Sequence, residues 1–298
     1  MDSAAVLALV RESTGAERIT SFARIQTLWS GYGELSRAHL VGGHVPTVIV
    51  KWAKAPTSSG GVHRATDASD RRKRRSYEVE GCFYREFAAR TGMACRVPAL
   101  LAHAAGRDEW MLVLEDLDAE RSGGYAARES NPSGVALDAC LSWLATFHAT
   151  FLSVSPKGLW PVGTYWHLAT RREELERARE SPLRRAAHDL DRALSGARFQ
   201  SIVHGDAKPD NFCFAHDRRS VAAVDFQYVG GGVGVKDVAY MLHGTGARVA
   251  ARALDGYFAH LRARLSPDVD GEALEREWRA LYPVAEDDFR RFLEGWRR

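Results

Sequence analysis

The feature that most constrains this chain is a strand-like segment, Gln200 to Phe226, inside an otherwise helical second half. Apolar residues alternate along it and predict a hairpin in which Phe212 to Phe214 pairs with Val221 to Phe226. Side chains on paired strands face one another, so residues near the open end of a hairpin lie close together. We therefore expect the polar residues around that end to converge.

Three oxygen-bearing side chains flank the open end of the hairpin, namely Asp206, Asn211 and Asp225. Carboxylate and amide oxygens suit Mg²⁺, a hard ion that proteins hold with one or two carboxylates together with substrate phosphates. The sequence predicts Asn211 and Asp225 as the metal ligands. A metal ion that binds substrate phosphates suits phosphoryl transfer. Transfer to an alcohol also needs a group that accepts the hydroxyl proton, and we assign that role to Asp206.

Two neighbours of Asp206 have more than one interpretation. Lys208 either offsets charge on the transferring phosphoryl group or is a solvated loop residue. His204 is either a base or zinc ligand, or a buried histidine whose ring nitrogens hold the backbone of the loop. A zinc site would need further His or Cys ligands at suitable spacing, and none lie near it in the sequence, which favours the second interpretation.

The first 118 residues read as an antiparallel meander with a helix, and residues 119–298 as a mainly helical second lobe. A helix is predicted over residues 4–12 and another from Lys73 to Ala89, preceded by an exposed loop over residues 54–71. The predicted strands are Ile19 to Ser30, Glu34 to Val41, Val45 to Trp52, Pro98 to Ala104 and Trp110 to Leu117. The predicted helices of the second lobe begin near residue 133 and then cover Arg171 to Glu180, Pro182 to Leu194, 246–264 and 271–296.

A glycine-rich turn joins the first two predicted strands. Gly31 and Gly33 allow backbone N–H groups to approach phosphates, and the Ser36 hydroxyl adds a possible donor. Taken alone, the glycine turn is weak evidence for phosphate binding, because Gly-x-Gly is common in hairpin turns.

The interpretation of this turn as a phosphate-binding site is strengthened by Lys51, the one charged residue in the strand VPTVIVKW. A lysine there is either an edge-strand solubility residue or a ligand for the α- and β-phosphates of a nucleotide. The second role needs an acid to hold the lysine. We choose Glu80 over Glu78, because Glu80 shares a helical face with the aromatic residues of its helix.

Charge and cysteine usage exclude several classes. The net charge of +3 is too small to indicate nucleic acid, and the basic run Arg71 to Arg75 is interpreted as a solvated loop entering a helix. No stretch approaches the roughly 18 apolar residues of a membrane span, and the apolar stretch Ala4 to Val10 lacks the basic segment of a secretory signal. The cysteines lie far apart among apolar residues, which favours reduced thiols and a cytoplasmic protein. They are Cys82, Cys95, Cys140 and Cys213.

The order of these motifs resembles the aminoglycoside phosphotransferase and choline kinase superfamily, which has a protein-kinase-like fold. The resemblance is carried by HGDAKPDN (His204 to Asn211), AVDFQ (Ala223 to Gln227) and, more weakly, the glycine turn. Four segments most resemble the ecdysteroid-kinase-like branch of that superfamily. They are Ser76 to Tyr84, Leu114 to Asp118, Leu144 to Phe151 and Asp225 to Tyr240.

The resemblance implies a two-lobed α+β fold with a five-stranded antiparallel sheet and helix first, then a mainly helical lobe with a catalytic β-hairpin. It implies ATP bound at a hinge, Mg²⁺ on Asn211 and Asp225, and a small-molecule alcohol as acceptor. The hinge residues are Leu114, Glu115, Asp116 and Leu117. A His-Gly-Asp triplet in place of the His-Arg-Asp of protein kinases argues against a protein substrate.

The acceptor itself stays open between an amino alcohol, a sugar, an aminoglycoside and a sterol-like alcohol. Acids after residue 271 either attract a cationic acceptor or form solvated helix faces, and the aromatic segment Trp160 to His167 either lines an acceptor pocket or is a packed loop. The alternative to an enzyme is a nucleotide-binding pseudokinase module without turnover. We expect a monomer or homodimer, with neither a nucleic acid nor a membrane as partner.

Overall fold

The structure is a computed structural model that describes residues 4–28, 31–55 and 67–296. The chain divides into two compact units, each with its own core. The N-terminal unit comprises Met1–Ala89 and Val97–Ala126, and the C-terminal unit comprises Arg90–Arg96 and Ala127–Arg298. The predicted boundary at residue 118 and the hinge at residues 114–117 stay predictions.

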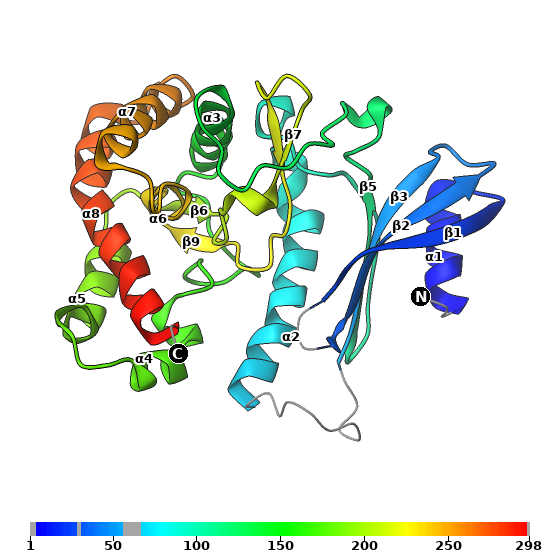
Figure 1. The fold of residues 1–298 in the computed structure, drawn as a ribbon, viewed down its shortest axis with the longest axis horizontal. Helices are drawn as coiled ribbons and strands as arrows, with labels where there is room; N and C mark the ends of the chain where they lie inside the picture. The colour runs from blue at the N-terminus through cyan, green and yellow to red at the C-terminus, as the bar shows by residue number, and fades with distance from the viewer. Residues whose placement is uncertain (1–3, 29–30, 56–66, 297–298) are drawn as a thin grey trace. The chain divides into compact units, whose positions relative to one another are not determined.

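The N-terminal unit is built on a five-stranded antiparallel sheet in the order β1-β2-β3-β5-β4 (Figure 1). The strands are β1 (Arg18–Thr27), β2 (Gly33–Val41), β3 (Thr47–Lys54), β4 (Leu100–Ala105) and β5 (Glu109–Glu115). This sheet confirms the predicted meander, with strand ends shifted by a few residues.

A helix covers each face of the sheet (Figure 1). Helix α1 (Ala4–Thr14) buries Val6 and Val10 against Val48 and Val50 of β3. Helix α2 (Asp67–Cys82) lies on the other face. Because side chains alternate along a strand, the residue that follows Val50 points to the α2 face. That residue is Lys51.

Helix α2 begins earlier than predicted. Of the predicted loop over residues 54–71, residues 56–66 lie outside the described part, and the helix already starts at Asp67. The basic run Arg71 to Arg75 is therefore helical throughout, which corrects its interpretation as a loop. An ion pair between Arg74 Nε and Asp70 Oδ2 at 2.6 Å joins adjacent turns and supports this first part of the helix.

The C-terminal unit is mainly helical, as predicted. Its α-helices are α3 (Val135–Thr150), α4 (Arg172–Arg177), α5 (Pro182–Ser195), α6 (Val235–Met241), α7 (Ala247–Arg262) and α8 (Gly271–Trp296). Trp143 and Phe147 of α3 stack at 5.0 Å between ring centroids, and Trp143 also meets the ring of Phe212 edge-on at 5.6 Å. This aromatic core supports the loop that carries Asp206 from behind.

Two small sheets complete the C-terminal unit. Strands β7 (Phe212–Phe214) and β8 (Val221–Ala223) form the predicted hairpin, although β8 is shorter than expected. Strand β6 (Ser201–Val203) pairs antiparallel with β9 (Gly230–Gly232), a strand of three glycines that the sequence did not predict.

Two further findings bear on the expected environment of the protein. Across the described residues, no helix combines the length and the apolar character needed to cross a bilayer. The cysteines, Cys82, Cys95, Cys140 and Cys213, are all free thiols.

Candidate active site

The loop that carries Asp206 is fixed by an acid from another element. Asp237, in the first turn of α6, is fully buried and accepts the backbone N–H of His204 at 2.6 Å and that of Gly205 at 3.0 Å. His148 of α3 donates Nε2–H to the same carboxylate at 3.1 Å, and its Nδ1 lies 2.8 Å from the Tyr257 hydroxyl. The loop backbone is thus tied to three helices of the C-terminal unit.

His204 is a structural residue. Its Nδ1 accepts the backbone N–H of Asp206 at 3.2 Å, and its Nε2 donates to the carbonyl of Val224 at 3.1 Å. Burial lowers the pKa of His204, so the ring is neutral at neutral pH. Both ring nitrogens are engaged, which favours the loop-holding interpretation over a base or a zinc ligand. Within the described residues, no group of three or more His, Cys, Asp or Glu side chains is placed to hold a metal.

Gly205 is required by the shape of the loop. Its φ is +80°, and a Cβ at this position would lie 2.0 Å from the backbone oxygen of Tyr228. An L side chain would meet both a disfavoured conformation and a backbone atom that cannot move alone. The glycine therefore lets the loop approach the segment that follows Asp225.

Asp206 lies 8% exposed at the apex of this loop. Asn211 donates its amide to the Asp206 carbonyl at 2.8 Å and to the carboxylate at 2.9 Å, and Lys208 Nζ lies 3.7 Å from the same carboxylate. Burial raises the pKa of Asp206 to about 7, with Asp225 adding to the rise and Lys208 opposing it. A carboxylate held near neutrality in this way can take up a proton at physiological pH.

Asp225 directly follows Val224, whose backbone is hydrogen-bonded to that of Asn211. The Val224 N–H donates to the Asn211 carbonyl at 3.0 Å, and Asp225 itself adopts a φ of +67°, which is uncommon for a residue with a side chain. Asp225 is close enough for its charge to raise the pKa of Asp206. The structure therefore gathers Asp206, Asn211 and Asp225 around the open end of the hairpin.

The N-terminal unit holds the second group of predicted residues. Lys51 Nζ lies 2.7 Å from Glu80 Oε2, and the two residues are only 9% and 1% exposed. Glu78, the alternative partner, pairs instead with Arg75 at 3.0 Å on the surface.

The glycine turn between β1 and β2 uses positive φ angles at both glycines, +72° at Gly31 and +138° at Gly33. Leu28 N–H donates to the Gly33 carbonyl at 2.8 Å and closes the turn. A Cβ on Gly33 would lie 2.1 Å from the Trp52 carbonyl, so this glycine permits the close approach of β2 to β3.

Ser36 does not have the position that the sequence analysis gave it. It pairs with Val50 in the β2–β3 register, whereas Leu35 pairs with Lys51. Its side chain therefore faces the α1 side of the sheet, where it is fully buried, and its hydroxyl has no hydrogen-bond partner in the part of the chain that is described. The prediction that Ser36 donates to the phosphates bound by Lys51 is wrong, because the two side chains lie on opposite faces.

The predicted hinge residues, Leu114 to Leu117, differ in the contacts that their side chains and backbone make. Leu114 and Glu115 are the last residues of β5. The Asp116 carboxylate accepts Arg37 Nε at 2.7 Å, and although burial opposes the effect, Arg37 lowers the pKa of Asp116. Leu117 accepts the Tyr125 N–H at 2.8 Å, while its own N–H donates to none of the described residues. Arg37, which orders this segment, was missed because an arginine in a strand gives no signal of its partner.

Comparisons with known proteins place the chain in a family. The model of the phosphotransferase enzyme family matches residues 55–283, well over half of the chain. The chain belongs to this phosphotransferase family. A search among curated proteins found no match.

Solved structures resemble this phosphotransferase in fold. The AMP-bound spectinomycin phosphotransferase APH(9)-Ia aligns with a TM-score of 0.51 and 12% identity, over 99% of this chain and 95% of that chain. An ethanolamine kinase of Plasmodium vivax aligns with a TM-score of 0.53 and 10% identity, over 93% of this chain and 77% of that chain. At such identities the likeness shows that the phosphotransferase shares the fold of these enzymes.

The donor set of the phosphotransferase fits a hard divalent cation. Because the Asn211 amide nitrogen is committed to Asp206, its Oδ1 is left as an acceptor with no hydrogen bond from the described residues. An amide oxygen beside the Asp225 carboxylate is a combination that Mg²⁺ binds.

Aromatic residues of the predicted segment Trp160 to His167 pack against Tyr228, and one of them, Tyr165, lies near Asp206. Trp160 stacks on Tyr228 at 6.1 Å, and Tyr165 packs edge-on against the same ring at 5.9 Å. Burial raises the pKa of Tyr165 to about 12, and the charge of Asp206 adds to the rise. Trp166, in contrast, is fully buried and packs as part of the core. The segment thus contains both a packed residue and half-buried rings near the catalytic loop.

The acids of α8 are engaged within the protein. Glu277 accepts the backbone N–H groups of Arg198 and Phe199, at 2.8 and 3.0 Å, and Asp288 pairs with Arg291 at 2.9 Å. Three others pair with arginines. They are Glu272 with Arg276, Glu275 with Arg262 and Arg279, and Asp287 with Arg290. These contacts favour structural helix faces over a cation-binding surface.

Proposed function

We propose that this phosphotransferase moves the γ-phosphate of ATP to a hydroxyl group of a small molecule. The observation that carries the proposal is the buried carboxylate of Asp206, held by the Asn211 amide at 2.9 Å on a loop whose backbone Asp237 fixes. A fixed carboxylate that can exchange a proton near neutral pH suits a group that must orient an alcohol and accept its proton.

The reaction follows from the roles of these side chains. Asp206 accepts the hydroxyl proton as the acceptor oxygen forms a bond to the γ-phosphorus, and the bond from that phosphorus to the β,γ-bridging oxygen breaks to leave ADP. Asn211 and Asp225 would hold Mg²⁺, which neutralises charge that develops on the phosphate oxygens. Lys208, half-exposed and 3.7 Å from Asp206, adds positive charge beside the base.

Groups of the N-terminal unit support a role in binding the nucleotide. Glu80 holds the Lys51 ammonium in one place, as a contact to the α- and β-phosphates requires. The glycine turn of Gly31 and Gly33 offers backbone close to β3, and the unused Leu117 N–H offers a donor to the adenine ring. The segment Leu114 to Leu117 is proposed as the adenine-binding hinge.

The acceptor proposed is an alcohol of low molecular weight, drawn from amino alcohols, sugars, aminoglycosides and sterol-like alcohols. The half-buried ring of Tyr165 near Asp206, which packs with Tyr228 and through it with Trp160, supports an acceptor with an apolar or cationic face. Membership of the ecdysteroid-kinase-like branch stays a prediction that rests on the sequence segments quoted above.

A coupled assay of ADP release tests the proposal. The unmodified chain is incubated with ATP, Mg²⁺ and a panel of choline, ethanolamine, sugars, aminoglycosides and sterols. We expect at least one acceptor to stimulate ADP release, Asp206→Asn to abolish the stimulation and Asp210→Asn to preserve it. Asp210 is the matched control, because it is an exposed acid of the same loop that accepts a hydrogen bond from Ser130 at 3.0 Å.

The outcome that contradicts the proposal is equally definite. If ATP binds but no hydroxylated compound stimulates its turnover, the chain is a nucleotide-binding module without catalysis. If Asp206→Asn retains acceptor-stimulated turnover, Asp206 is not the base.

A further inference from the structure

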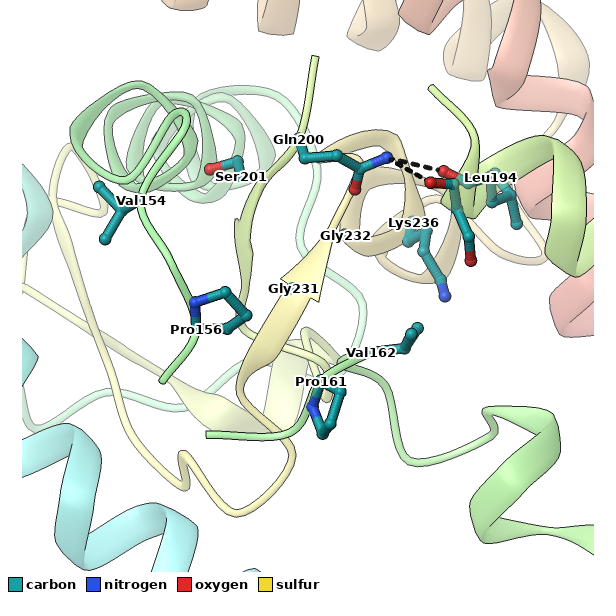
Figure 2. Close-up of a pocket in the computed structure, with 11 residues that line it drawn as sticks. Val154, Pro156, Pro161, Val162, Leu194, Gln200, Ser201, Gly231, Gly232 and Lys236 are labelled. Carbon is teal, nitrogen blue, oxygen red and sulfur yellow. Dashed lines mark hydrogen bonds between the residues drawn. The ribbon is translucent and has the colours of Figure 1, made fainter. Parts of the chain in front are cut away.

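The C-terminal unit contains a cavity beside the β6–β9 pair (Figure 2). Its volume is about 250 Å³, far above the ~10–15 Å³ that one water needs. Most of its walls are apolar or glycine. The lining residues are Val154, Pro156, Pro161, Val162, Leu194, Ser195, Gln200, Ser201, Gly231, Gly232 and Lys236.

The one cationic side chain of this lining is almost completely buried. Lys236, the second residue of α6, is 2% exposed, and its side chain extends toward Val162 in Figure 2. Its ammonium makes no hydrogen bond and no ion pair within 4.0 Å to any residue that the structure describes. Burial lowers the pKa of Lys236, as expected for a cation that lacks a direct partner.

The acids nearest to Lys236 are occupied by other groups. Asp191 accepts His167 Nε2 at 3.0 Å, and Asp288 accepts Arg291 at 2.9 Å. Asp237 accepts the backbone N–H groups of His204 and Gly205. These carboxylates favour the charged form of Lys236 from a distance but leave its ammonium without a contact.

A second polar side chain in the lining is that of Gln200, the residue just before β6. Gln200 donates Nε2 to the carbonyls of Leu194 and Ala197, at 3.0 and 3.2 Å. Its amide oxygen accepts no hydrogen bond from the described residues, and in Figure 2 it points away from Leu194 toward Gly232. The cavity therefore offers a buried cation and the acceptor oxygen of Gln200 within mostly apolar walls.

We propose that this cavity binds a compact monocarboxylate, with the carboxylate on Lys236 and the apolar body against Pro156, Pro161 and Val162. Pairing with an anion would compensate the burial of the ammonium. The charges of Asp191, Asp237 and Asp288 act on Lys236 together with that of Arg291. Because the three acids outnumber the two cations, a ligand with one negative charge is favoured over a phosphate monoester with two.

The cavity is separate from the proposed phosphoryl-transfer groups. In the antiparallel register Ser201 pairs with Gly232 and Val203 pairs with Gly230. Gln200 and Gly232 therefore lie at the start of β6, whereas Asp206 follows the other end of the strand. The two sites are connected through α6, in which Lys236 directly precedes the Asp237 that fixes the loop, and through the segment Trp160 to His167, of which Pro161 and Val162 line the cavity.

Isothermal titration calorimetry on the full chain, without ATP or metal, tests the proposal with benzoate as probe. Benzamide is the neutral isostere and phenyl phosphate the more highly charged analogue. We expect benzoate to bind in a one-to-one complex, with benzamide and phenyl phosphate each at least tenfold weaker.

Variants locate the binding. Lys236→Met removes the cation and Val162→Phe fills the cavity without changing any charge, and each should weaken benzoate at least tenfold. Lys157→Met, at an exposed lysine of the neighbouring loop, should leave the affinity unchanged. The proposal is overturned if benzoate does not bind, if benzamide or phenyl phosphate binds as tightly, or if both cavity variants retain the native affinity. Should Lys236→Met fail to fold, the ligand series and Val162→Phe decide.

Discussion

Asn211 donates one amide group to two oxygens of Asp206, the backbone carbonyl at 2.8 Å and the carboxylate at 2.9 Å. The amide thereby fixes both the loop and the direction of the proposed base. It also leaves the Asn211 Oδ1 as an acceptor for the proposed metal. A single side chain thus links the position of the base to that of the cation.

Asp206→Asn should separate catalysis from stability. Loss of the base lowers kcat by roughly 10²–10⁴-fold, whereas removal of a buried charge raises the free energy of unfolding by about 1–2 kcal/mol. Steady-state kinetics and urea denaturation measure the two effects. A variant that loses stability together with activity would show that the carboxylate holds the loop instead of acting on the substrate.

Asp237→Asn should loosen the catalytic loop from behind. Its carboxylate accepts two backbone N–H groups, and charge-assisted hydrogen bonds of this kind contribute about 1.5–3 kcal/mol. We expect destabilisation of about 2–3 kcal/mol with a fall in kcat. Asp138→Asn is the control, because Asp138 pairs with His260 on the surface at 2.9 Å. It should change the unfolding free energy by less than about 0.5 kcal/mol.

Lys51 and Glu80 should be strongly coupled. Removal of one member of a buried ion pair leaves an uncompensated charge and costs about 3 kcal/mol. Lys51→Met and Glu80→Gln should each destabilise the chain by that amount, and the double variant by clearly less than the sum. Chemical denaturation of the four proteins completes the cycle, and strict additivity would show that the pair is not coupled. ATP affinity should fall in Lys51→Met.

Gly205→Ala tests the close approach in the catalytic loop against a matched glycine. Gly205 and Gly244 have nearly the same φ, +80° and +81°, but only Gly205 has a backbone atom where a Cβ would lie. Gly244→Ala should cost about 1–2 kcal/mol from the disfavoured conformation alone. Gly205→Ala should cost more than about 4 kcal/mol or prevent folding. Equal losses in thermal denaturation would mean that the loop yields at Tyr228.

Lys236→Met should stabilise the protein in a pH-dependent manner. Since the folded pKa lies below the ordinary value of 10.5, the unfolded chain binds the proton more tightly than the folded chain. Native stability therefore rises as pH increases between the folded pKa and 10.5. The advantage of the variant, roughly 1–3 kcal/mol at pH 7, should shrink toward pH 10. Denaturation of both proteins at several pH values measures it, with Lys157→Met as a control that shows no such trend.

The elements that the sequence predicted well are those in which local pattern and burial agree. Strand β3 is a run of β-branched and other apolar residues, and the hairpin β7–β8 has an apolar residue at every buried position, so both were predictable. Strand β9 was not, because Gly230–Gly232 has no side chains to show a pattern, and its pairing with β6 is set by tertiary contacts. The start of α2 was missed because the polar residues before Lys73 carry no apolar periodicity.

The site was predictable where chemistry demands particular residue types, and less so where orientation decides. The spacing of their motif predicted that Asp206 and Asn211 lie together, and a hydrogen bond of 2.9 Å joins them, whereas the error at Ser36 came from strand register. Which face a strand residue occupies depends on its neighbours in the sheet, and these are set across the fold. Lys236 gave no signal, since a lysine in a helix is ordinarily exposed.

The bonds from Asp237 reach the main chain of His204 and Gly205 and no side chain of the residues after Asp206. The attachment of the loop to α6 through Asp237 therefore does not depend on the side chains of Ala207, Lys208 or Asp210. An exposed position of the loop such as Asp210 can therefore be varied while the main chain on either side of the base stays attached to the rest of the C-terminal unit.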